Sequence, residues 1–561
     1  MKYDKWLLPK PIETNLPNPS GRYSEIETQI LLKRNLSTPE EIEEFIHPTT
    51  ASTHDPMLLT GMHHAISRIK AAANNYEQVG IFGDFDTDGI TGTALLQKGL
   101  KNFGISAKTY IPDRLNEGHG ISQSAISFFR DQNVKLIITV DCGTTSTHEI
   151  RTANDLGIDT IITDHHTPTS EIPEACAIVN SSLPNCSYPF KYLTGVGTAF
   201  KLIEGMHQEL NLEYPQSLLP LVSLGTISDV GVMRGENRYM VKHGLEILRT
   251  SKMTGLDALA NVGNISKSRF DSESLSFGII PRLNAAGRLE HASLSLDLLV
   301  SEDSNQSTVI AERLEYLNKR RQKMTEQAML DAQRQVDRLN TPIPPIIFVG
   351  KSGWSPGILG LIAGRLAEAY QRPTIAASGD SDLCRASARS IEAFNMIEAL
   401  DKCSTFFDKY GGHPMAAGFQ ISRSQLNDFR KRMTSIAAEE LANHDFSSEL
   451  HIDSEIPLTW LHAESLRFLQ SLEPYGQGNT EPIFISKEIS VVSARTVGRM
   501  GAHLKLTLEF AGKLYDAIAF RQGERLKEAT GSIDAVYSAG INHWNGKETL
   551  QLTIRDFRRS S

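Results

Sequence analysis

The chain has 561 residues, of which 40% are hydrophobic and 22% are charged, and its formal net charge is −9. A chain of this length is expected to divide into two to four domains, and it has no run of about 20 apolar residues that could span a bilayer. The acidic balance argues against a non-specific nucleic-acid coat, which would be basic, but it allows an enzyme with an acidic metal centre and a local basic groove.

Residues 1–50 form an N-terminal lead-in for which the sequence predicts no chemistry. From about residue 77 to residue 230, strand-like runs such as VGIF, KLIITV and DTIIT alternate with helix-compatible segments such as THEIRTANDL. This alternation predicts βαβ units and a parallel sheet. We therefore expect an α/β domain over residues 51–235.

The stretch GDFDTDG at residues 83–89 resembles the start of an EF-hand calcium loop. An EF-hand requires a Glu at loop position 12 and a helix in front of the loop. Counting from Asp84, position 12 is Leu95, and the preceding VGIFG is a run of strand formers. The calcium-loop hypothesis fails on both points, which leaves a strand whose carboxyl end presents acidic residues.

Acidic or imidazole side chains follow each predicted strand in turn. They are Asp84, Asp86 and Asp88 after the first strand, Asp141 after the second, Asp164, His165 and His166 after the third, and Asp229 after a further apolar run that is also expected to end at the site. In open α/β sheets, ligands bind outside the carboxyl ends of the strands. Carboxylates and imidazoles there suit two Mn²⁺ or Mg²⁺ ions about 3.5–4 Å apart, which catalyse phosphoryl transfer. Asp141 is the candidate bridging ligand because it comes from the middle of the set.

The rest of the chain is expected to form three further regions. Residues 236–340 contain a helical connector, formed by one long helix or two abutting ones, because Asp303 to about Leu339 lacks Gly and Pro and carries apolar residues at helical spacing. Residues 341–450 are a second α/β region, with the glycine-rich pieces SGWSPGILGLIAGR and YGGHPMAAGF. Residues 451–561 contain regular short strands that predict a small β-barrel.

Several of these motifs carry a family resemblance. The chain resembles the DHH phosphoesterases and, within them, the RecJ family of bacterial single-strand-specific 5′→3′ exonucleases. The resemblance runs from about residue 50 to the C-terminus and includes GDFDTDG, VDCG, TDHH, SDVGVM, PRLNAAGRL, SARS, YGGHPMAAGF and EPYGQGNTEPIF. It implies a multidomain α/β protein with a parallel-sheet DHH domain, a long helical connector, a DHHA1 α/β domain and a C-terminal OB-fold barrel that binds nucleic acid.

The resemblance also implies roles for the acidic and imidazole residues. By position, Asp84, Asp86 and Asp88 form the first metal motif, Asp141 is the bridging and catalytic ligand, and His165 and Asp229 bind the second ion. Asp164 orients a histidine, and His166 faces the scissile phosphate. Phe82 stands where related pyrophosphatases have a metal-binding histidine, which leaves the coordination of the first ion open.

A 5′-directed exonuclease needs a pocket for a terminal phosphate, and the planar guanidinium of arginine can pair with two phosphate oxygens. The positions that match the family's phosphate contacts are Arg114, Arg282 or Arg288, and Ser387 with Arg389. His413 in YGGHPMAAGF is either a phosphate donor or part of a glycine turn between domains. In the barrel, Phe484, Tyr515, Phe520 and Trp544 could stack on bases, although at least half must be core; Trp544 is the best candidate for exposure.

We therefore expect a single-stranded-DNA exonuclease that uses two Mn²⁺ or Mg²⁺ ions in recombinational repair and mismatch excision. By analogy, its partners are single-strand-binding protein and a RecQ-type helicase, and a monomer is the default. Five cysteines without a CxxC pair and an N-terminus without an h-region favour the cytoplasm. Two alternatives stay open: a phosphoesterase for short oligonucleotides, cyclic dinucleotides or pyrophosphate, and a non-catalytic DNA-binding scaffold.

Overall fold

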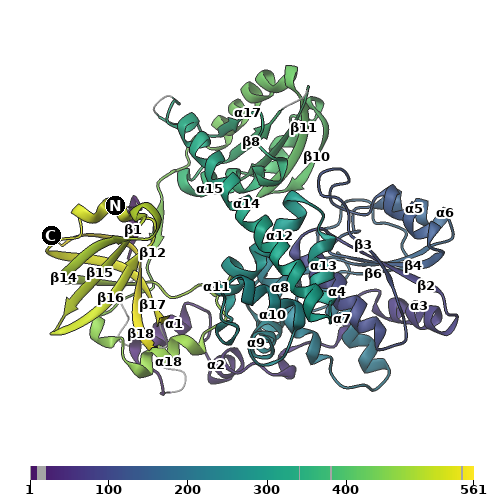
Figure 1. Ribbon diagram of the computed structural model, residues 1–561, viewed down its shortest axis with the longest axis horizontal. Coiled ribbons are helices and arrows are strands. Elements are labelled where there is room, and N and C mark those ends of the chain that lie inside the picture. Colours follow the sequence, from purple (N-terminus) through teal and green to yellow (C-terminus); the bar gives the residue numbers. More distant parts are fainter. Residues whose placement is uncertain (1, 9–20, 340–341, 380–381, 545–546, 561) are drawn as a thin grey trace. The chain divides into compact units, whose positions relative to one another are not determined.

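The computed structural model describes residues 2–8, 21–339, 342–379, 382–544 and 547–560 of the chain. Their contacts define two compact units (Figure 1). The first unit combines the two ends of the chain, Met1–Ser52 and Ser447–Ser561, with Met233–Gly235; the second consists of Thr53–Val232 and Glu236–Phe446. No helix in the described part of the chain is both long and apolar enough to cross a membrane.

The second unit contains a five-stranded parallel sheet in the order β3-β2-β4-β5-β6. Its strands are β2 (Gln78–Gly83), β3 (Lys108–Tyr110), β4 (Val134–Val140), β5 (Asp159–Thr163) and β6 (Ala177–Val179). The three apolar runs that predict strands thus form the centre of the sheet. Helices pack beside these strands: α3 (Met62–Asn74), α4 (Thr87–Lys101), α5 (Gln123–Asp131), α6 (Thr147–Asp155) and α7 (Gly195–Glu209).

The register of this sheet aligns the residues that follow its strands. Gly83 is the Cα partner of Val140, Val140 of Thr163, and Thr163 of Val179. The next residue of each strand continues the ladder, since the N–H groups of Asp84, Asp141 and Asp164 donate to Val140, Thr163 and Val179. Asp84, Asp141, Asp164 and Asn180 therefore lie in a row at one edge of the sheet, as expected for the carboxyl ends of parallel strands.

A helical region follows the parallel sheet. It consists of α8 (Leu219–Ser228), α9 (Gly235–Thr250), α10 (Thr254–Val262), α11 (Ser272–Ser274), the π-helix η5 (Leu275–Ile279), α12 (Ile280–Leu289), α13 (Ser293–Val300) and α14 (Ser304–Val336). The predicted connector is a single helix, α14, of 33 residues. The side chain of Asp303 accepts a hydrogen bond from Gln306 N–H and caps its first turn. At 1.5 Å per residue this helix is about 50 Å long.

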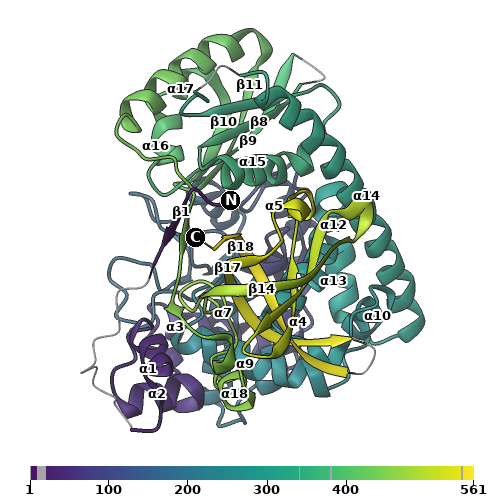
Figure 2. The same cartoon turned by 90° about the vertical axis from the view of Figure 1, so that its left-hand side faces the viewer.

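The second unit also contains a mixed sheet in the order β10-β11-β9-β8-β7. Its strands are β7 (Ile347–Gly350), β8 (Thr374–Ser378), β9 (Leu383–Arg389), β10 (Phe407–His413) and β11 (Ala416–Ser422). One hydrophobic cluster joins this sheet to α16 (Met396–Asp401) and α17 (Leu426–Glu440), and another joins it to α14 and α15 (Pro356–Tyr370). Helices thus cover both faces, with α15 and α17 on opposite sides in Figure 2.

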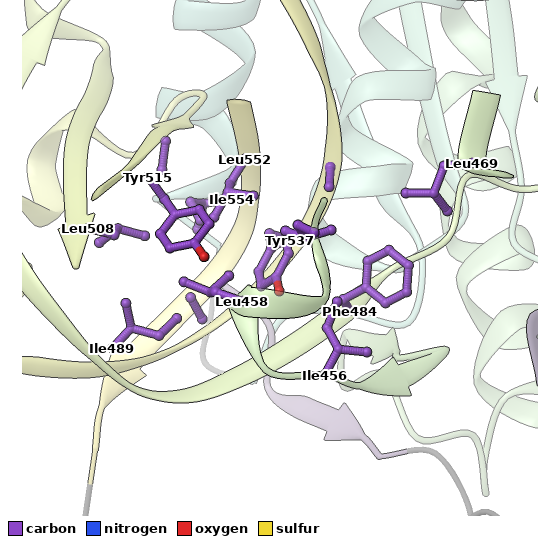
Figure 3. Close-up of a cluster of buried hydrophobic side chains, with 14 of the residues drawn as sticks. Ile456, Leu458, Leu469, Phe484, Ile489, Leu508, Tyr515, Tyr537, Leu552 and Ile554 are labelled. Carbon is purple, nitrogen blue, oxygen red and sulfur yellow. The ribbon is translucent and has the colours of Figure 1, made fainter. Parts of the chain in front are cut away.

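The first unit contains a closed β-barrel. Its strands are β14 (Phe484–Val497), β15 (His503–Phe510), β16 (Lys513–Ala519), β17 (Ser532–Trp544) and β18 (Lys547–Arg559), and β17 pairs back with β14 to close the ring. The short β13 (Ser454–Glu455) pairs in parallel with the start of β14, and α18 (Ala463–Ser471) lies beside β17. Phe484 and Tyr515 are buried in the barrel core (Figure 3), whereas Phe520 is 46% exposed.

The N-terminal segment is built into this barrel unit. Strand β1 (Lys5–Leu7) pairs in parallel with β12 (Glu449–His451), and helices α1 (Glu25–Leu32) and α2 (Pro39–Ile46) add apolar side chains to the barrel core. Trp6 Nε1 donates to the buried Asp556 at 2.9 Å. The lead-in therefore has a structural role next to the last barrel strand.

Candidate active site

The carboxylate loop between β2 and α4 has the geometry that its sequence predicts. Asp84 follows the strand directly, and Asp86 is the N-cap of α4, accepting hydrogen bonds from the N–H groups of Asp88 (2.9 Å) and Gly89 (3.3 Å). Because the loop turns from a strand into a helix within three residues, Asp84, Asp86 and Asp88 all remain close to the edge of the sheet.

Asp88 is fixed by the N-terminus of helix α7. Its Oδ2 and Oδ1 atoms accept hydrogen bonds from Gly195 N–H (2.7 Å) and Val196 N–H (2.9 Å). A Cβ atom on Gly195 would lie 2.4 Å from Asp141 Cβ and 2.6 Å from Asp141 Oδ1, so only glycine allows this approach. The sequence interpretation missed both residues, although Thr194 before GVG has the form of an N-cap and a helix start.

The TDHH motif forms a compact hydrogen-bonded group after β5. Asp164 Oδ1 lies 2.7 Å from His166 Nδ1, and its Oδ2 accepts from Thr144 N–H at 2.9 Å. Asn180 Nδ2, from the next strand end, donates to the backbone oxygen of His166 at 2.9 Å. Asp164 therefore orients His166, as the resemblance implies, and Asn180 is a supporting residue that the sequence interpretation missed.

The two histidines of this motif have opposite charge preferences. Burial lowers the pKa of His165 to about 4, and the neighbouring His166 adds to this effect, so His165 is neutral as a metal ligand must be. Burial also acts against a charged His166, but its hydrogen bond to Asp164 and the charge of that carboxylate outweigh burial and raise its pKa to about 9. The same pairing holds the pKa of Asp164 well below its ordinary value despite its burial.

Metal-ligand atoms gather in three overlapping groups within the described residues. The groups are Asp84 with Asp86 and Asp141; Asp88 with His165 and Asp229; and Asp141 with Asp164, His165 and His166. Asp141 belongs to two of them, and its Oδ1 lies 3.0 Å from His165 Nε2. This position is compatible with the bridging role that the resemblance implies for Asp141. The resemblance assigns Asp88 to the first motif, whereas its carboxylate here joins His165 and Asp229.

Asp229 reaches this centre from a different element than expected. The run PLVSLGTIS before it is helix α8, with Asp229 as its C-cap, and is not a strand. Every residue from Leu219 to Ile227 is buried, so the run is apolar on all sides and has no helical periodicity to read. The expectation that the apolar run before Asp229 is a strand was wrong. Asp229 nevertheless lies at the centre, with its Oδ2 3.8 Å from His165 Nε2.

The donor set fits divalent cations. Burial and mutual repulsion raise the pKa of Asp86, Asp88 and Asp141, and burial together with Asp86 raises that of Asp229 to about 7. Within the described residues, the buried atoms Asp84 Oδ1 and His165 Nε2 form no hydrogen bond of good geometry, although Nε2 lies close to Asp141 Oδ1. Such crowded oxygen and imidazole donors match the preferences of Mn²⁺, and the oxygens match those of Mg²⁺.

Phe82 does not take part in this centre. It is fully buried in the sheet core and stacks on Tyr110 with ring centroids 5.9 Å apart. His119 is the imidazole next to the first group, because its Nδ1 lies 3.2 Å from Asp84 Oδ2 and its ring lies 4.4 Å from that of Phe85. His119 lies five residues after Arg114 in the segment IPDRLNEGHG at residues 111–120, but no spacing pattern connects it to Asp84, and the sequence interpretation missed it.

The half-buried side chains of Arg114, Arg288 and Arg389 form a cluster near the carboxylates. Burial lowers the pKa of Arg288 to about 9, with further contributions from Arg114, Arg321 and Arg389, and burial followed by Arg114 lowers that of Arg389. Arg288 Nη1 donates to Gly357 O (3.1 Å), and Arg389 Nη1 donates to Ser387 Oγ (3.2 Å) and Ala388 O (2.8 Å). In the described part of the chain, no carboxylate forms an ion pair with Arg114, Arg288 or Arg389. Cationic side chains that lack an ion-pair partner can bind an anion such as phosphate.

Family models match three regions of the chain: the DHH family, N-terminal domain, at residues 78–226; the DHHA1 domain at 344–439; and the RecJ OB domain at 452–556. The chain is 36% identical over 532 residues to the "Single-stranded-DNA-specific exonuclease RecJ" of Bacillus subtilis, covering 94% of this chain and 67% of that protein. It is 33% identical to the protein of the same name in Haemophilus influenzae, covering 93% and 94%. The chain belongs to the RecJ family.

A RecJ crystal structure has the same architecture. The structure of Thermus thermophilus RecJ in complex with Mn²⁺ matches 99% of this chain and 79% of that chain, with a TM-score of 0.83 and 28% identity, and the same protein has been solved in complex with Mg²⁺. The DHH, DHHA1 and OB-fold predictions are thereby confirmed. The long match also accounts for α14 as part of the RecJ fold rather than a linker peculiar to this chain.

Three further residues that the sequence analysis assigned to the site are Arg282, His413 and Trp544. Arg282 forms an ion pair with Glu315 (2.6 Å) and donates to Gly278 O, so its guanidinium is occupied within the helical region. His413 comes from β10 and stacks on His166 with centroids 5.3 Å apart and an interplanar angle of 10°. The side chain of Trp544 lies outside the described residues, so its role stays a prediction.

Proposed function

We propose that this RecJ-family chain is a metal-dependent exodeoxyribonuclease that degrades single-stranded DNA from the 5′ end and releases 5′-mononucleotides. The observation that carries the proposal is the presence, within one compact unit, of a carboxylate and histidine centre suited to two divalent ions and a half-buried arginine cluster suited to phosphate. The relatives named above are single-stranded-DNA-specific exonucleases, which supports the substrate class.

The proposed cofactors are two Mn²⁺ or Mg²⁺ ions. Asp84 and Asp86 would hold the first ion, Asp88, His165 and Asp229 would hold the second, and Asp141 would contribute to both. When bound, such a pair lowers the pKa of a water molecule and neutralises charge on the phosphodiester. The ions bound to Thermus thermophilus RecJ support this assignment.

His166 is the proposed catalytic residue outside the ligand set. Its Nδ1 is bound to Asp164, which leaves Nε2 as a donor toward a phosphate oxygen at the centre. The raised pKa of His166 keeps that donor charged at neutral pH. A fixed cationic donor aimed at developing negative charge stabilises a transition state more than a mobile one, because it does not reorganise.

The terminal-phosphate pocket is proposed to consist of Arg114, Arg288, Ser387 and Arg389, with His413 at its border. Arg114 lies over the ring of Phe85, with its Cζ atom 4.7 Å from the ring centroid. Phe85 stands in the sequence between Asp84 and Asp86. A terminal phosphate bound beside the metal centre would present the first phosphodiester for cleavage, and this arrangement accounts for both the 5′ polarity and the mononucleotide product.

The biological role, the protein partners and the oligomeric state are proposed as extensions of this function. Recombinational repair and mismatch excision, single-strand-binding protein and a RecQ-type helicase as partners, and a monomeric state follow by analogy with the RecJ family. A phosphoesterase for dinucleotides or pyrophosphate would need neither the long helix nor the barrel, and a non-catalytic scaffold would not need the full ligand set.

The decisive experiment is degradation of end-labelled single-stranded DNA with Mn²⁺ or EDTA. Substrates blocked at the 5′ or the 3′ end and a matched duplex test polarity and strand selection. We expect metal-dependent mononucleotide release that only the 5′ block prevents. Asp141→Ala should abolish turnover while strand binding survives, and Asp131→Ala, at an exposed position of α5, is the control. Cleavage of dinucleotides alone would support the small-substrate enzyme, and binding without cleavage would support the scaffold.

A further inference from the structure

Helix α12, which carries the motif PRLNAAGRL, contacts the carboxylate loop directly. Asn284 Oδ1 accepts a hydrogen bond from Thr87 N–H at 3.1 Å. Thr87 is the first residue of α4, and its N–H belongs to the orphan donors of a helix start. Asp86 serves the next two donors, those of Asp88 and Gly89. Asn284 therefore completes the cap of the helix that begins inside the metal motif.

A second contact joins the same helix to the backbone between two ligands. A Cβ atom added to Gly287 would lie 3.0 Å from the carbonyl oxygen of Phe85 and 3.3 Å from Ala292 Cβ, so the helix backbone lies directly against the loop at Phe85. Phe85 itself stands between Asp84 and Asp86 and is 2% exposed. Any displacement of α12 at this point is passed to both carboxylates.

The C-terminal end of α12 contributes one residue, Arg288, to the arginine cluster. Arg288 follows Gly287, and its Nη1 donates to the backbone of Gly357 at the start of α15. Arg114 reaches the same loop from the other side through the ring of Phe85. One helix thus touches the carboxylate loop with Asn284 and Gly287 and contributes to the phosphate pocket with the next residue.

We propose that Asn284 and Gly287 are positioning residues, which hold the carboxylate loop against α12 and so keep the metal centre and the terminal-phosphate pocket one nucleotide apart. This inference rests on the proposed exonuclease function and deepens it. Asn284 and Gly287 bind neither the ions nor the DNA. They determine which phosphodiester lies at the centre once the terminal phosphate is bound.

The test uses the full chain and the variants Asn284→Ala, Asn284→Asp and Gly287→Ala, with Asn261→Ala on the exposed side of α10 as control. Calorimetric Mn²⁺ titration, kcat and KM on 5′-phosphorylated strands, product length and thermal midpoint are measured for each. We expect Asn284→Ala to weaken Mn²⁺ binding about 10-fold, the usual effect of losing a group that orders a metal ligand. Asn284→Asp keeps an acceptor oxygen and should restore most of that affinity.

Gly287→Ala should shift the loop by a few tenths of an ångström. We expect a lower kcat, an unchanged preference for 5′-phosphorylated over 5′-hydroxyl strands, and the appearance of dinucleotides among the products. If Asn284→Ala and Gly287→Ala change only the thermal midpoint, α12 has a merely structural role and the inference is overturned. If the wild-type chain degrades no strand, the proposed function fails instead, and the Mn²⁺ titrations still decide whether Asn284 orders the loop.

Discussion

His166 Nδ1 lies 2.7 Å from Asp164 Oδ1, and this same oxygen accepts hydrogen bonds from the backbone N–H groups of His165 (2.7 Å) and His166 (3.2 Å). One buried carboxylate oxygen thus fixes the position of the whole motif and the charge of its second histidine. We expect Asp164→Asn to lower kcat about 10- to 100-fold, the range found when the partner of a site histidine is removed. Single-turnover rates on a 5′-phosphorylated strand measure the effect.

The control for this substitution is Asp131→Asn, which removes the same charge from an exposed side chain. The control should keep the wild-type rate, and strand affinity should be equal in both variants. A wild-type kcat for Asp164→Asn would show that His166 needs no orienting carboxylate.

Gly195 supplies a matched pair of substitutions within one helix. Gly195→Ala puts a methyl group 2.4 Å from Asp141 Cβ and displaces the proposed bridging ligand, whereas Gly197→Ala meets nothing closer than 3.4 Å. We expect Gly195→Ala to lose at least 10-fold in Mn²⁺ affinity and in kcat, since ligand geometry controls both. Gly197→Ala should bind Mn²⁺ and turn over as the wild type does. Equal Mn²⁺ isotherms for the two variants would refute the close-approach argument.

Arg389 distinguishes phosphate recognition from general strand binding. Arg389→Ala removes a half-buried guanidinium that donates to Ser387, so we expect the preference for 5′-phosphorylated over 5′-hydroxyl strands to fall about 10-fold, since a charge-assisted contact contributes on the order of 1.5–3 kcal/mol. Arg320→Ala removes an exposed arginine of α14 and should leave that preference intact. The measurement is the ratio of kcat/KM values for the two strand ends. If Arg389→Ala keeps the wild-type ratio, the pocket lies elsewhere.

The barrel unit has an acid-sensitive contact at Asp556. This fully buried carboxylate accepts from Arg525 Nη1 (2.7 Å), Trp6 Nε1 (2.9 Å) and two backbone N–H groups of the N-terminus. Burial acts against its ionisation, but these donors outweigh burial and lower its pKa. A lowered folded-state pKa contributes stability that is present above the unfolded value of about 4 and is lost as the pH falls toward the folded value.

We therefore expect Asp556→Asn to destabilise the barrel unit by on the order of 3 kcal/mol at pH 7, because Arg525 loses its buried counter-charge and keeps only the exposed carboxylate of Glu528 as an ion-pair partner. Urea titrations followed by tryptophan fluorescence at pH 7 and at pH 3 test this. The gap between wild type and variant should shrink at the lower pH. A gap of the same size at both values would contradict the assigned pKa shift.

The sequence predicted the parts of the site that depend on strand ends. Asp84, Asp141 and Asp164 follow β-branched runs whose period and turn residues are visible, and the parallel register then brings the three together. The long helix α14 could also be predicted, because a segment that lacks Gly and Pro and carries apolar residues at helical spacing has few other stable conformations.

The remaining parts arise from packing that leaves no pattern in the chain. Gly195 and Val196 act through backbone N–H groups, which every residue type except proline has, and His119 reaches Asp84 only because its loop folds back over Phe85. Arg282 has the residue type and the motif of a phosphate contact, but Glu315 on α14, 33 positions later, occupies it. The helix before Asp229 could not be distinguished from a strand because it is buried on all sides.

The pairing of β1 with β12 sets an order for biosynthesis. Residue 5 leaves the ribosome almost 450 residues before its partner Glu449, so at roughly 5–20 residues per second the N-terminal arm waits about 20 to 90 s for the strand that it joins. During that time Trp6 and the apolar faces of α1 and α2 have none of their barrel partners. The exposed apolar side chains of such a nascent chain are binding sites for chaperones until the barrel strands have been synthesised. A premature stop codon before these strands would leave the N-terminal segment without its packing partners.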